Sequence, residues 1–411
     1  MSDEEFYSGA DRYDLERIAS HHKKALKNGD KELIRDYIDW KMSTKHISSV
    51  RARKIAYSLI AWEYYMDKAF LRLKIEDVHH GITAMKDGKT IGGPRKGRAL
   101  AQNTQRDMVK ILKPFLRWLI KEKGSKIPLE KVVDREDGIS APKAQKTQIT
   151  SSMILTVEEV LNTIKATRCR RDQALLSVLY ESGCRIGELG RLQWKDAVFD
   201  EYGIKLYLSD RKVGQKRYYR LTMSRPALAA LKDTIPGSPA DTAYIFIDDK
   251  GERMKYKACD KILRTAAKKA GITKHVHLHL LRHSRATHMK AQGFSDSTIK
   301  KALWNNEKTD QWDTYVNLSE EDVDGEFLNM AGVSKEEKKA KIAEGLKPRI
   351  CYYCGEESLS NAQFCWKCGS PLSKDARKEY DSADKQIEES ELYQKAVEAA
   401  YQRLKAEMGK A

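Results

Sequence analysis

The chain has 411 residues, of which 41% are hydrophobic, and its formal net charge is +17 at pH 7. This length predicts two or three domains with cores of ordinary size, and the charge favours a polyanionic partner, because lysine and arginine displace counterions from phosphates. A basic protein without such a partner, or one bound to an acidic membrane surface, remains the alternative. No run of about 18 apolar residues is present, which excludes a transmembrane helix.

The N-terminal segment, MSDEEFYSGADRYD, is acidic and has no apolar core, so we expect no secretory signal. Seven cysteines without such a signal fit a reducing compartment, and four of them lie together near the C-terminus. This distribution favours a metal site over disulfide bonds.

Residues 1–136 predict a helical domain. Apolar residues recur at three- and four-residue spacing from Val50 to Tyr65, and a second amphipathic helix is predicted from Thr104 to Lys121, with a kink at Pro114. The basic loop from Lys86 to Arg98 lies between them. It is either a solvated connection or a contact for phosphates.

The polar residues 137–152 include no aromatic side chain and predict a linker. A capping-box pattern of Thr156 and Glu159 then opens a helix. Two alternating segments, Gly203 to Ser209 and Arg217 to Met223, predict a β-hairpin, and Tyr244 to Ile247 is a candidate third strand. Helical patterns surround these strands. The predicted fold class is therefore mainly α with a small antiparallel β-sheet (α+β), and the second domain covers residues 153–335.

Four separated motifs in the second domain are informative together. They are Ser182-Gly183-Cys184-Arg185-Ile186-Gly187-Glu188-Leu189, the hairpin Lys212-Val213-Gly214, the stretch His279-Leu280-Leu281-Arg282, and Trp312-Asp313-Thr314-Tyr315-Val316. Each alone has an ordinary explanation, since an arginine and a glutamate three residues apart form a helix ion pair, a hairpin lysine is solvated, and a tyrosine packs in a core. Their joint order and separation are more specific.

In this order the motifs resemble the catalytic domain of tyrosine recombinases, the phage integrase family, over residues 155–333. The sequences ESGCRIGELGRLQWKD and HLHLLRHSRATHM are close to those of the family at these two motifs. The resemblance implies a site made of an arginine pair, a histidine, a hairpin lysine and a tyrosine nucleophile: Arg185, Arg282, His279, Lys212 and Tyr315. Residues 53–118 also resemble the helical, DNA-gripping N-terminal (core-binding) domain of the family.

The chemistry of these residue types agrees with that implication. Attack on a phosphodiester builds negative charge on the non-bridging oxygens, and two planar guanidiniums stabilise that charge. A tyrosine hydroxyl has a pKa near 10 in model peptides, so it needs proton removal or an electropositive pocket, which His279 and the arginines would supply. Lys212 would protonate the leaving 5′-oxygen, and Glu188 would orient Arg185. Because a 3′-phosphotyrosyl link keeps the bond energy for religation, we expect no catalytic cofactor and no ATP.

Two positions stay open. The family places a histidine or tryptophan shortly before the nucleophile, and here either Trp304 or Asn306 occupies that position. We predict Trp304, which requires a longer spacer to Tyr315 than is usual. The hairpin lysine is either Lys212 or Lys216, and we predict Lys212, because it directly precedes the Val213-Gly214 turn.

Two C-x-x-C motifs lie in residues 348–373, and each is followed directly by glycine; their cysteines are Cys351, Cys354, Cys365 and Cys368. Four thiolates at this spacing predict a zinc ribbon with a closed, structural Zn²⁺ site, and a redox role is the alternative. Residues 374–411 predict a C-terminal helix with an apolar face formed by Tyr393, Val397, Ala400, Leu404 and Met408. That face would pack on its own chain or on a neighbouring subunit.

We therefore predict a site-specific recombinase that integrates or excises a mobile element, similar to archaeal proviral integrases. Its expected partners are double-stranded DNA, further copies of the chain in a tetramer, and accessory DNA-bending proteins, with no membrane partner. The expected location is the cytoplasm, in association with the nucleoid. A non-catalytic DNA-binding regulator on the same scaffold is the alternative, and a type IB topoisomerase shares the chemistry but not the H-x-x-R wording.

Overall fold

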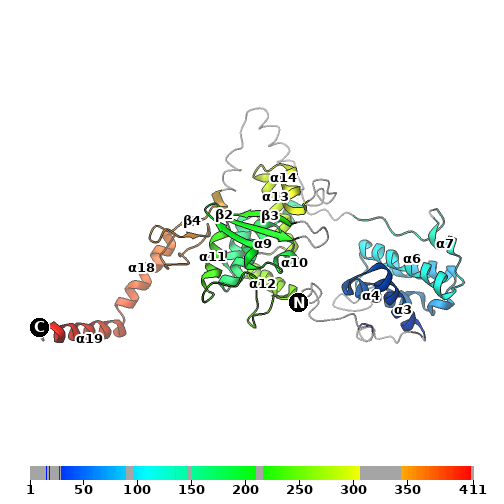
Figure 1. The fold of residues 1–411 in the computed structure, drawn as a ribbon, viewed down its shortest axis with the longest axis horizontal. Helices are drawn as coiled ribbons and strands as arrows, with labels where there is room; N and C mark the ends of the chain where they lie inside the picture. The colour runs from blue at the N-terminus through cyan, green and yellow to red at the C-terminus, as the bar shows by residue number, and fades with distance from the viewer. Residues whose placement is uncertain are drawn as a thin grey trace, which may run out of the picture. The chain divides into compact units, whose positions relative to one another are not determined.

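The computed structural model describes Leu15, Ile18 and Lys27 together with residues 29–88, 97–134, 136–145, 150–209, 216–305 and 344–408. The chain divides into two compact units, residues 1–147 and 148–411. Both are mostly helical, and the only sheets within the described residues are small and antiparallel (Figure 1). The predicted fold class is confirmed.

The first unit is formed by helices whose apolar faces meet in one core. Its helices are α3 (Asp30–Lys45), α4 (Ser49–Met66), α5 (Ile75–Asp87), α6 (Gln102–Lys123) and α7 (Leu129–Val133). The helices α4 and α6 correspond to the two amphipathic patterns, and α6 continues through Pro114. Aromatic rings fill the centre, where Tyr37 and Phe70 each contact Phe115 edge to face.

The second unit begins with the helices that the capping-box pattern predicts. The hydroxyl of Thr156 accepts from the backbone N–H of Glu159, whose carboxylate accepts from the backbone N–H of Thr156. The described helices before residue 306 are α8 (Val157–Lys165), α9 (Arg170–Ser182), α10 (Ile186–Leu189), α11 (Arg225–Asp233), α12 (Tyr256–Lys269), α13 (Leu278–Ala291) and α14 (Asp296–Trp304). The buried helix α9 contacts α8, α11 and α13, so the core of this unit surrounds it.

A three-stranded antiparallel sheet lies beside these helices, in the order β1 (Ala197–Asp200), β2 (Gly203–Ser209) and β3 (Lys216–Leu221). The prediction of a third strand at Tyr244 to Ile247 is wrong, because Tyr244 and Ile247 form only isolated bridges. The strand next to β2 is instead β1, which a two-residue turn connects to it, with Asp200 opposite Gly203. A turn this short lets neighbouring segments pair locally.

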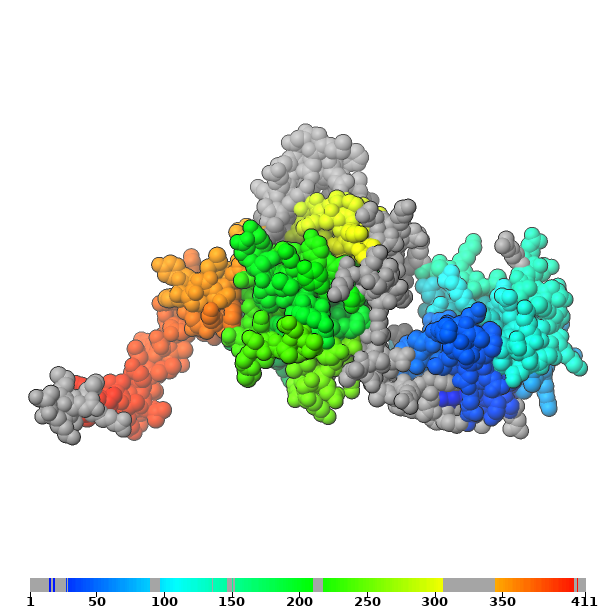
Figure 2. Space-filling view, in the orientation of Figure 1, coloured from blue at the N-terminus to red at the C-terminus, as the bar shows by residue number. Residues whose placement is uncertain are grey.

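Three further groups of elements follow residue 343. The short strands β4 (Arg349–Ile350) and β5 (Glu357–Ser358) pair with each other near the four cysteines. Helices α18 (Lys374–Glu388) and α19 (Glu391–Met408) end the described chain. Figure 2 shows residues 344–373, in orange, directly against the part of the second unit that is drawn in green.

Candidate functional site

The turn from α9 into α10 positions Arg185. Gly183 ends α9 in a left-handed conformation with φ of 55°, which glycine adopts at little cost, and Arg185 then precedes the first turn of α10. The carboxylate of Glu188 accepts from the backbone N–H of Arg185 at 2.6 Å and lies 3.5 Å from its guanidinium. The side chain of Glu188 is 5% exposed and that of Arg185 is 43% exposed. The buried carboxylate of Glu188 therefore positions the half-exposed guanidinium of Arg185.

Arg282 lies in α13 and is almost fully buried. Its Nη1 donates to the carbonyl of Gly183 at 2.6 Å, and its Nη2 donates to the carbonyl of Leu303 at 2.7 Å. Its guanidinium also lies 4.9 Å from the ring centre of Trp304, the last residue of α14, in a cation–π contact. Arg282 thus connects the turn before Arg185 with the end of α14 that carries Trp304.

A further buried arginine, Arg217, joins this group, although it belongs to none of the four sequence motifs. Its Nη2 donates to Glu188 Oε2 at 2.7 Å, and its Nη1 donates to the carbonyls of Ala302, at 2.8 Å, and Leu303. The signal that could have found it is the alternation of β3, which places Arg217 on the same buried face as Tyr219 and Leu221. A charged residue at a position where the pattern requires an apolar one indicates a buried partner.

His279 stands at the start of α13, three residues before Arg282. Desolvation, together with the smaller effects of Arg282, His277 and Arg185, lowers the pKa of His279 to about 4. The imidazole is therefore neutral at pH 7 and can accept a proton. Its ring contacts that of His283 edge to face, with centroids 5.0 Å apart, and burial lowers the pKa of His283 to about 3.

The structure thus brings Arg185, Arg282, Glu188, His279 and Trp304 into one region, where cationic groups outnumber the single buried carboxylate. Such a region binds an anion and stabilises developing negative charge. Three predicted or alternative positions, Tyr315, Lys212 and Asn306, lie outside the described residues. Lys216 begins β3, with its backbone opposite Ser209.

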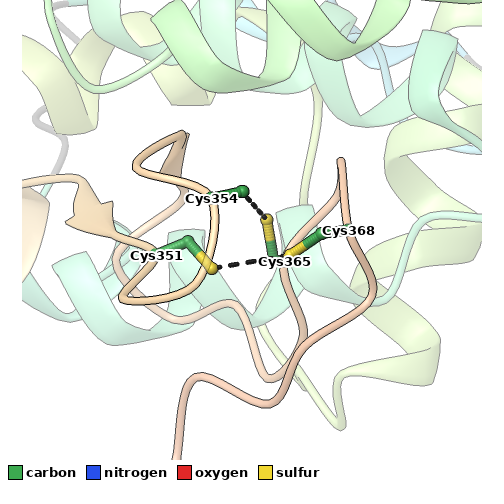
Figure 3. A group of neighbouring side chains, drawn as sticks. All are labelled: Cys351, Cys354, Cys365 and Cys368. Atoms are coloured by element: carbon green, nitrogen blue, oxygen red, sulfur yellow. Dashed lines mark hydrogen bonds between the residues drawn. The ribbon is translucent and has the colours of Figure 1, made fainter.

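The four cysteines of the predicted ribbon lie together, as Figure 3 shows. Their sulfur atoms are all within 4.8 Å of one another, and Cys351–Cys368 and Cys354–Cys365 are each separated by 3.6 Å. The two C-x-x-C turns are alike, since Gly355 and Gly369 both have positive φ and donate to the carbonyls of Cys351 and Cys365. A tetrahedral site with Zn–S bonds of about 2.3 Å has sulfur–sulfur edges of about 3.8 Å, so the donor set fits Zn²⁺.

This cysteine module is attached to the helices of the second unit by polar contacts. Arg170, the first residue of α9, donates to the carbonyl of Trp366 at 2.9 Å and lies 5.7 Å from the centre of its ring. Arg225 pairs with Glu357 at 2.9 Å, and Asn361 donates to the carbonyl of Leu161 at 2.7 Å. Leu346 and Leu359 belong to the same buried cluster as the helices. Residues 344–373 are therefore a packed part of the second unit.

The surface beyond the cysteine module is different. Tyr352, within the module, is 95% exposed, and the large apolar side chains along α18 and α19, including Tyr393 and Val397, are exposed as well. The apolar face predicted for the final helix is thus uncovered at the side chains that the structure describes. No described helix is both long enough and apolar enough to span a membrane.

Comparison with known proteins agrees with this arrangement. Residues 154–321 match the phage integrase family. Transposase A from transposon Tn554 of Staphylococcus aureus is 29% identical over 199 residues, which are 45% of this chain and 54% of that protein. Tyrosine recombinase XerD of Bifidobacterium longum is 29% identical over 181 residues, 41% of this chain and 59% of the relative. The chain thus spans little more than half the length of these relatives.

The crystal structure of a lambda integrase dimer bound to a COC′ core site superimposes with a TM-score of 0.51. It is 16% identical in sequence and covers 70% of this chain and 98% of that chain. The fold is therefore that of an integrase, with the arginine-rich region at the junction of α10, α13 and α14. Residues 154–321 thus match the phage integrase family, and the relatives include proteins named tyrosine recombinases.

Proposed function

We propose that the protein is a site-specific DNA recombinase that cleaves and rejoins strands through a 3′-phosphotyrosyl intermediate at Tyr315. The observation that carries this proposal is the convergence of Arg185, Arg282 and the neutral imidazole of His279 within the segment that matches the family. Tyr315 lies inside the matched residues as well. The related transposase and Xer recombinase support a role in DNA rearrangement.

In the proposed reaction, the hydroxyl oxygen of Tyr315 attacks the scissile phosphorus and the bond to the 5′-oxygen breaks. The guanidiniums of Arg185 and Arg282 stabilise the charge on the non-bridging oxygens. His279 is neutral at pH 7 and accepts the proton of the tyrosine hydroxyl; because its lowered pKa makes it a weak base, the step also requires the arginines to lower the pKa of Tyr315. Lys212 donates a proton to the leaving oxygen, and Trp304 supports Arg282 by stacking on it. The phosphotyrosyl bond is then attacked by a 5′-hydroxyl, which restores the tyrosine.

A covalent trapping experiment tests this function even though the target sequence has yet to be identified. The full-length protein is incubated with genomic DNA of its source that carries random nicks. Where a nick lies just 3′ of the cleaved bond, the short fragment that carries the free 5′-hydroxyl diffuses away and religation fails. Proteolysis and mass spectrometry then search for the peptide of Tyr315 with an attached nucleotide phosphate. The proposal expects this adduct in the wild type and none in Tyr315→Phe. DNA binding without any adduct in the wild type would instead support the non-catalytic regulator.

We also propose that the substrate is double-stranded DNA and that the active form is a homo-oligomer, a tetramer on two duplexes. The net positive charge of the chain supports a DNA substrate, and the structural similarity to the lambda integrase dimer supports a homo-oligomer.

The uncovered face of α19 is a candidate contact between subunits. Sedimentation on DNA of a chain that ends at Ser373 tests this contact, and unchanged assembly would exclude it. Integration or excision of a mobile element, as in archaeal proviral integrases, remains our prediction from the sequence Tyr-Val-x-Leu-Ser at residues 315–319 and from the cysteine module that follows it.

Finally, we propose that Cys351, Cys354, Cys365 and Cys368 hold a structural Zn²⁺. Four thiolates leave no open position on the ion, so this site supplies folding energy rather than catalysis. One zinc per chain is expected by elemental analysis. Because residues 344–373 pack on α8, α9 and α11, chelation is expected to lower the melting temperature of the second unit as a whole. Chelation that releases zinc but leaves this melting temperature unchanged would contradict the structural role.

A further inference from the structure

Arg217 has a set of contacts that the proposed reaction does not use. It lies on the buried face of β3, and its side chain is 5% exposed. Burying a guanidinium costs several kcal/mol unless it is paired, and the partners of its Nη1 and Nη2 offset part of this cost, whereas its Nε has no hydrogen-bond partner among the described residues. Those partners are the carboxylate of Glu188 and the carbonyls of Ala302 and Leu303. Each partner is adjacent to a candidate catalytic residue.

The carbonyl of Leu303 accepts from two guanidiniums. Arg217 reaches it from β3, and Arg282 reaches it from α13 at 2.7 Å. This carbonyl lies in the last turn of α14, where the helix dipole favours positive charge. The next residue, Trp304, stacks on Arg282. The end of α14 is therefore held from two sides by buried cations.

Glu188 connects the same arginine to the other side of the site. Its Oε2 accepts from Arg217 at 2.7 Å and from the backbone N–H of Arg185 at 2.6 Å. One carboxylate oxygen thus ties the start of α10 to β3. Through Arg217 the position of Arg185 becomes coupled to the position of Leu303, although the two residues are far apart in sequence.

We infer that Arg217 is a positioning residue of the strand-cleavage site, which fixes Glu188, and thereby Arg185, relative to the end of α14. This inference rests on the proposed recombinase function. We assign Arg217 a positioning role because its Nη2 donates to Glu188, the partner of Arg185, and its Nη1 donates to the carbonyl of Ala302 in the last turn of α14. A lysine could not replace it fully, since one ammonium group lacks the planar fork that reaches a carboxylate and two carbonyls together.

The test compares Arg217→Gln, Arg217→Lys and a matched control in the trapping assay on nicked genomic DNA. The control is Arg253→Gln, because Arg253 is also a buried arginine of the second unit and donates to the carbonyl of Gly190. Rates of adduct formation, DNA affinity and melting temperatures are measured for all variants, at a temperature well below the lowest melting point.

The expected result is a rate about 10- to 100-fold lower in Arg217→Gln, a smaller loss in Arg217→Lys, and DNA affinity within about twofold of wild type, because misplacement of a catalytic group acts on the chemical step. Combining Arg217→Gln with Glu188→Gln is expected to slow cleavage no further than the more severe single variant, since both act through the same contact.

Three results would overturn the inference while leaving the recombinase function intact. These are wild-type rates in both Arg217 variants, rate losses that merely follow the melting temperature as in Arg253→Gln, and additive losses in the double variant. Absence of an adduct in the wild type would instead refute the proposed function itself.

Discussion

The buried histidine His288 makes the stability of the second unit depend on pH. It lies in α13 with 8% of its surface exposed, and its Nδ1 is 2.8 Å from the hydroxyl of the buried Tyr180. Burial lowers its pKa from 6.5 to about 4, and the charge of Arg285 acts in the same direction. The folded protein therefore holds this side chain neutral.

Acid destabilises the second unit through His288, because the unfolded chain binds a proton there more readily than the folded chain does. Between pH 6.5 and about 4 the unfolded chain binds a proton at this position and the folded chain does not, so acid favours unfolding. The stabilisation of the folded state by the neutral His288 is fully present above the unfolded pKa of 6.5, and it is lost as the pH falls towards about 4. With these two pKa values, His288 lowers the free energy of unfolding by about 2 kcal/mol between about pH 7.5 and about pH 5.

The substitution His288→Gln removes the titrating group. It is expected to cost about 1 kcal/mol near pH 7.5, because the hydrogen bond to Tyr180 is lost or weakened. The difference from wild type should then shrink by about 2 kcal/mol at pH 5, so that the variant becomes the more stable protein.

Urea-induced unfolding of the full-length protein at a series of pH values measures this difference. The transition of the second unit is followed by limited proteolysis. His275→Gln, in the exposed loop before α13, serves as the control for the loss of a histidine outside the core. Equal losses of stability in wild type and His288→Gln as the pH falls would refute the reasoning.

Three further predictions concern groups that hold the second unit together. The carboxylate of Glu181 accepts from the backbone N–H groups of residues 222–224, directly before α11. Glu181→Gln should therefore lower the free energy of unfolding in urea by about 1.5–3 kcal/mol, and a decrease below about 0.5 kcal/mol would contradict this. Gly183→Ala should destabilise by about 1–2 kcal/mol, because its φ is positive and the new Cβ would lie 2.5 Å from Leu303. Arg170→Ala should increase hydrogen exchange in residues 351–368, and unchanged exchange would show that its contact with Trp366 is not needed.

Local patterns in the sequence determined most of the elements. The spacing of apolar residues predicted α4 and α6 to within two residues, and the Thr156 capping box marked the start of α8. The alternation from Gly203 to Ser209 predicted β2 with its observed bounds. These features depend on hydrogen bonds and side-chain periodicities that span only a few residues, so the chain itself reveals them. The third strand was predicted wrongly because a segment of four residues carries little periodicity.

The order of the motifs, including the proposed nucleophile Tyr315, is a feature of the sequence alone, and the family match covers the same residues. The tertiary structure decided how the motif residues are held. It showed that Arg217 is the partner of Glu188, that Arg217 and Arg282 share the carbonyl of Leu303, and that the cysteine module packs on α9. These contacts join residues from separate elements. A buried charge finds its partner only when the core closes around it, and no local pattern specifies which residue that will be.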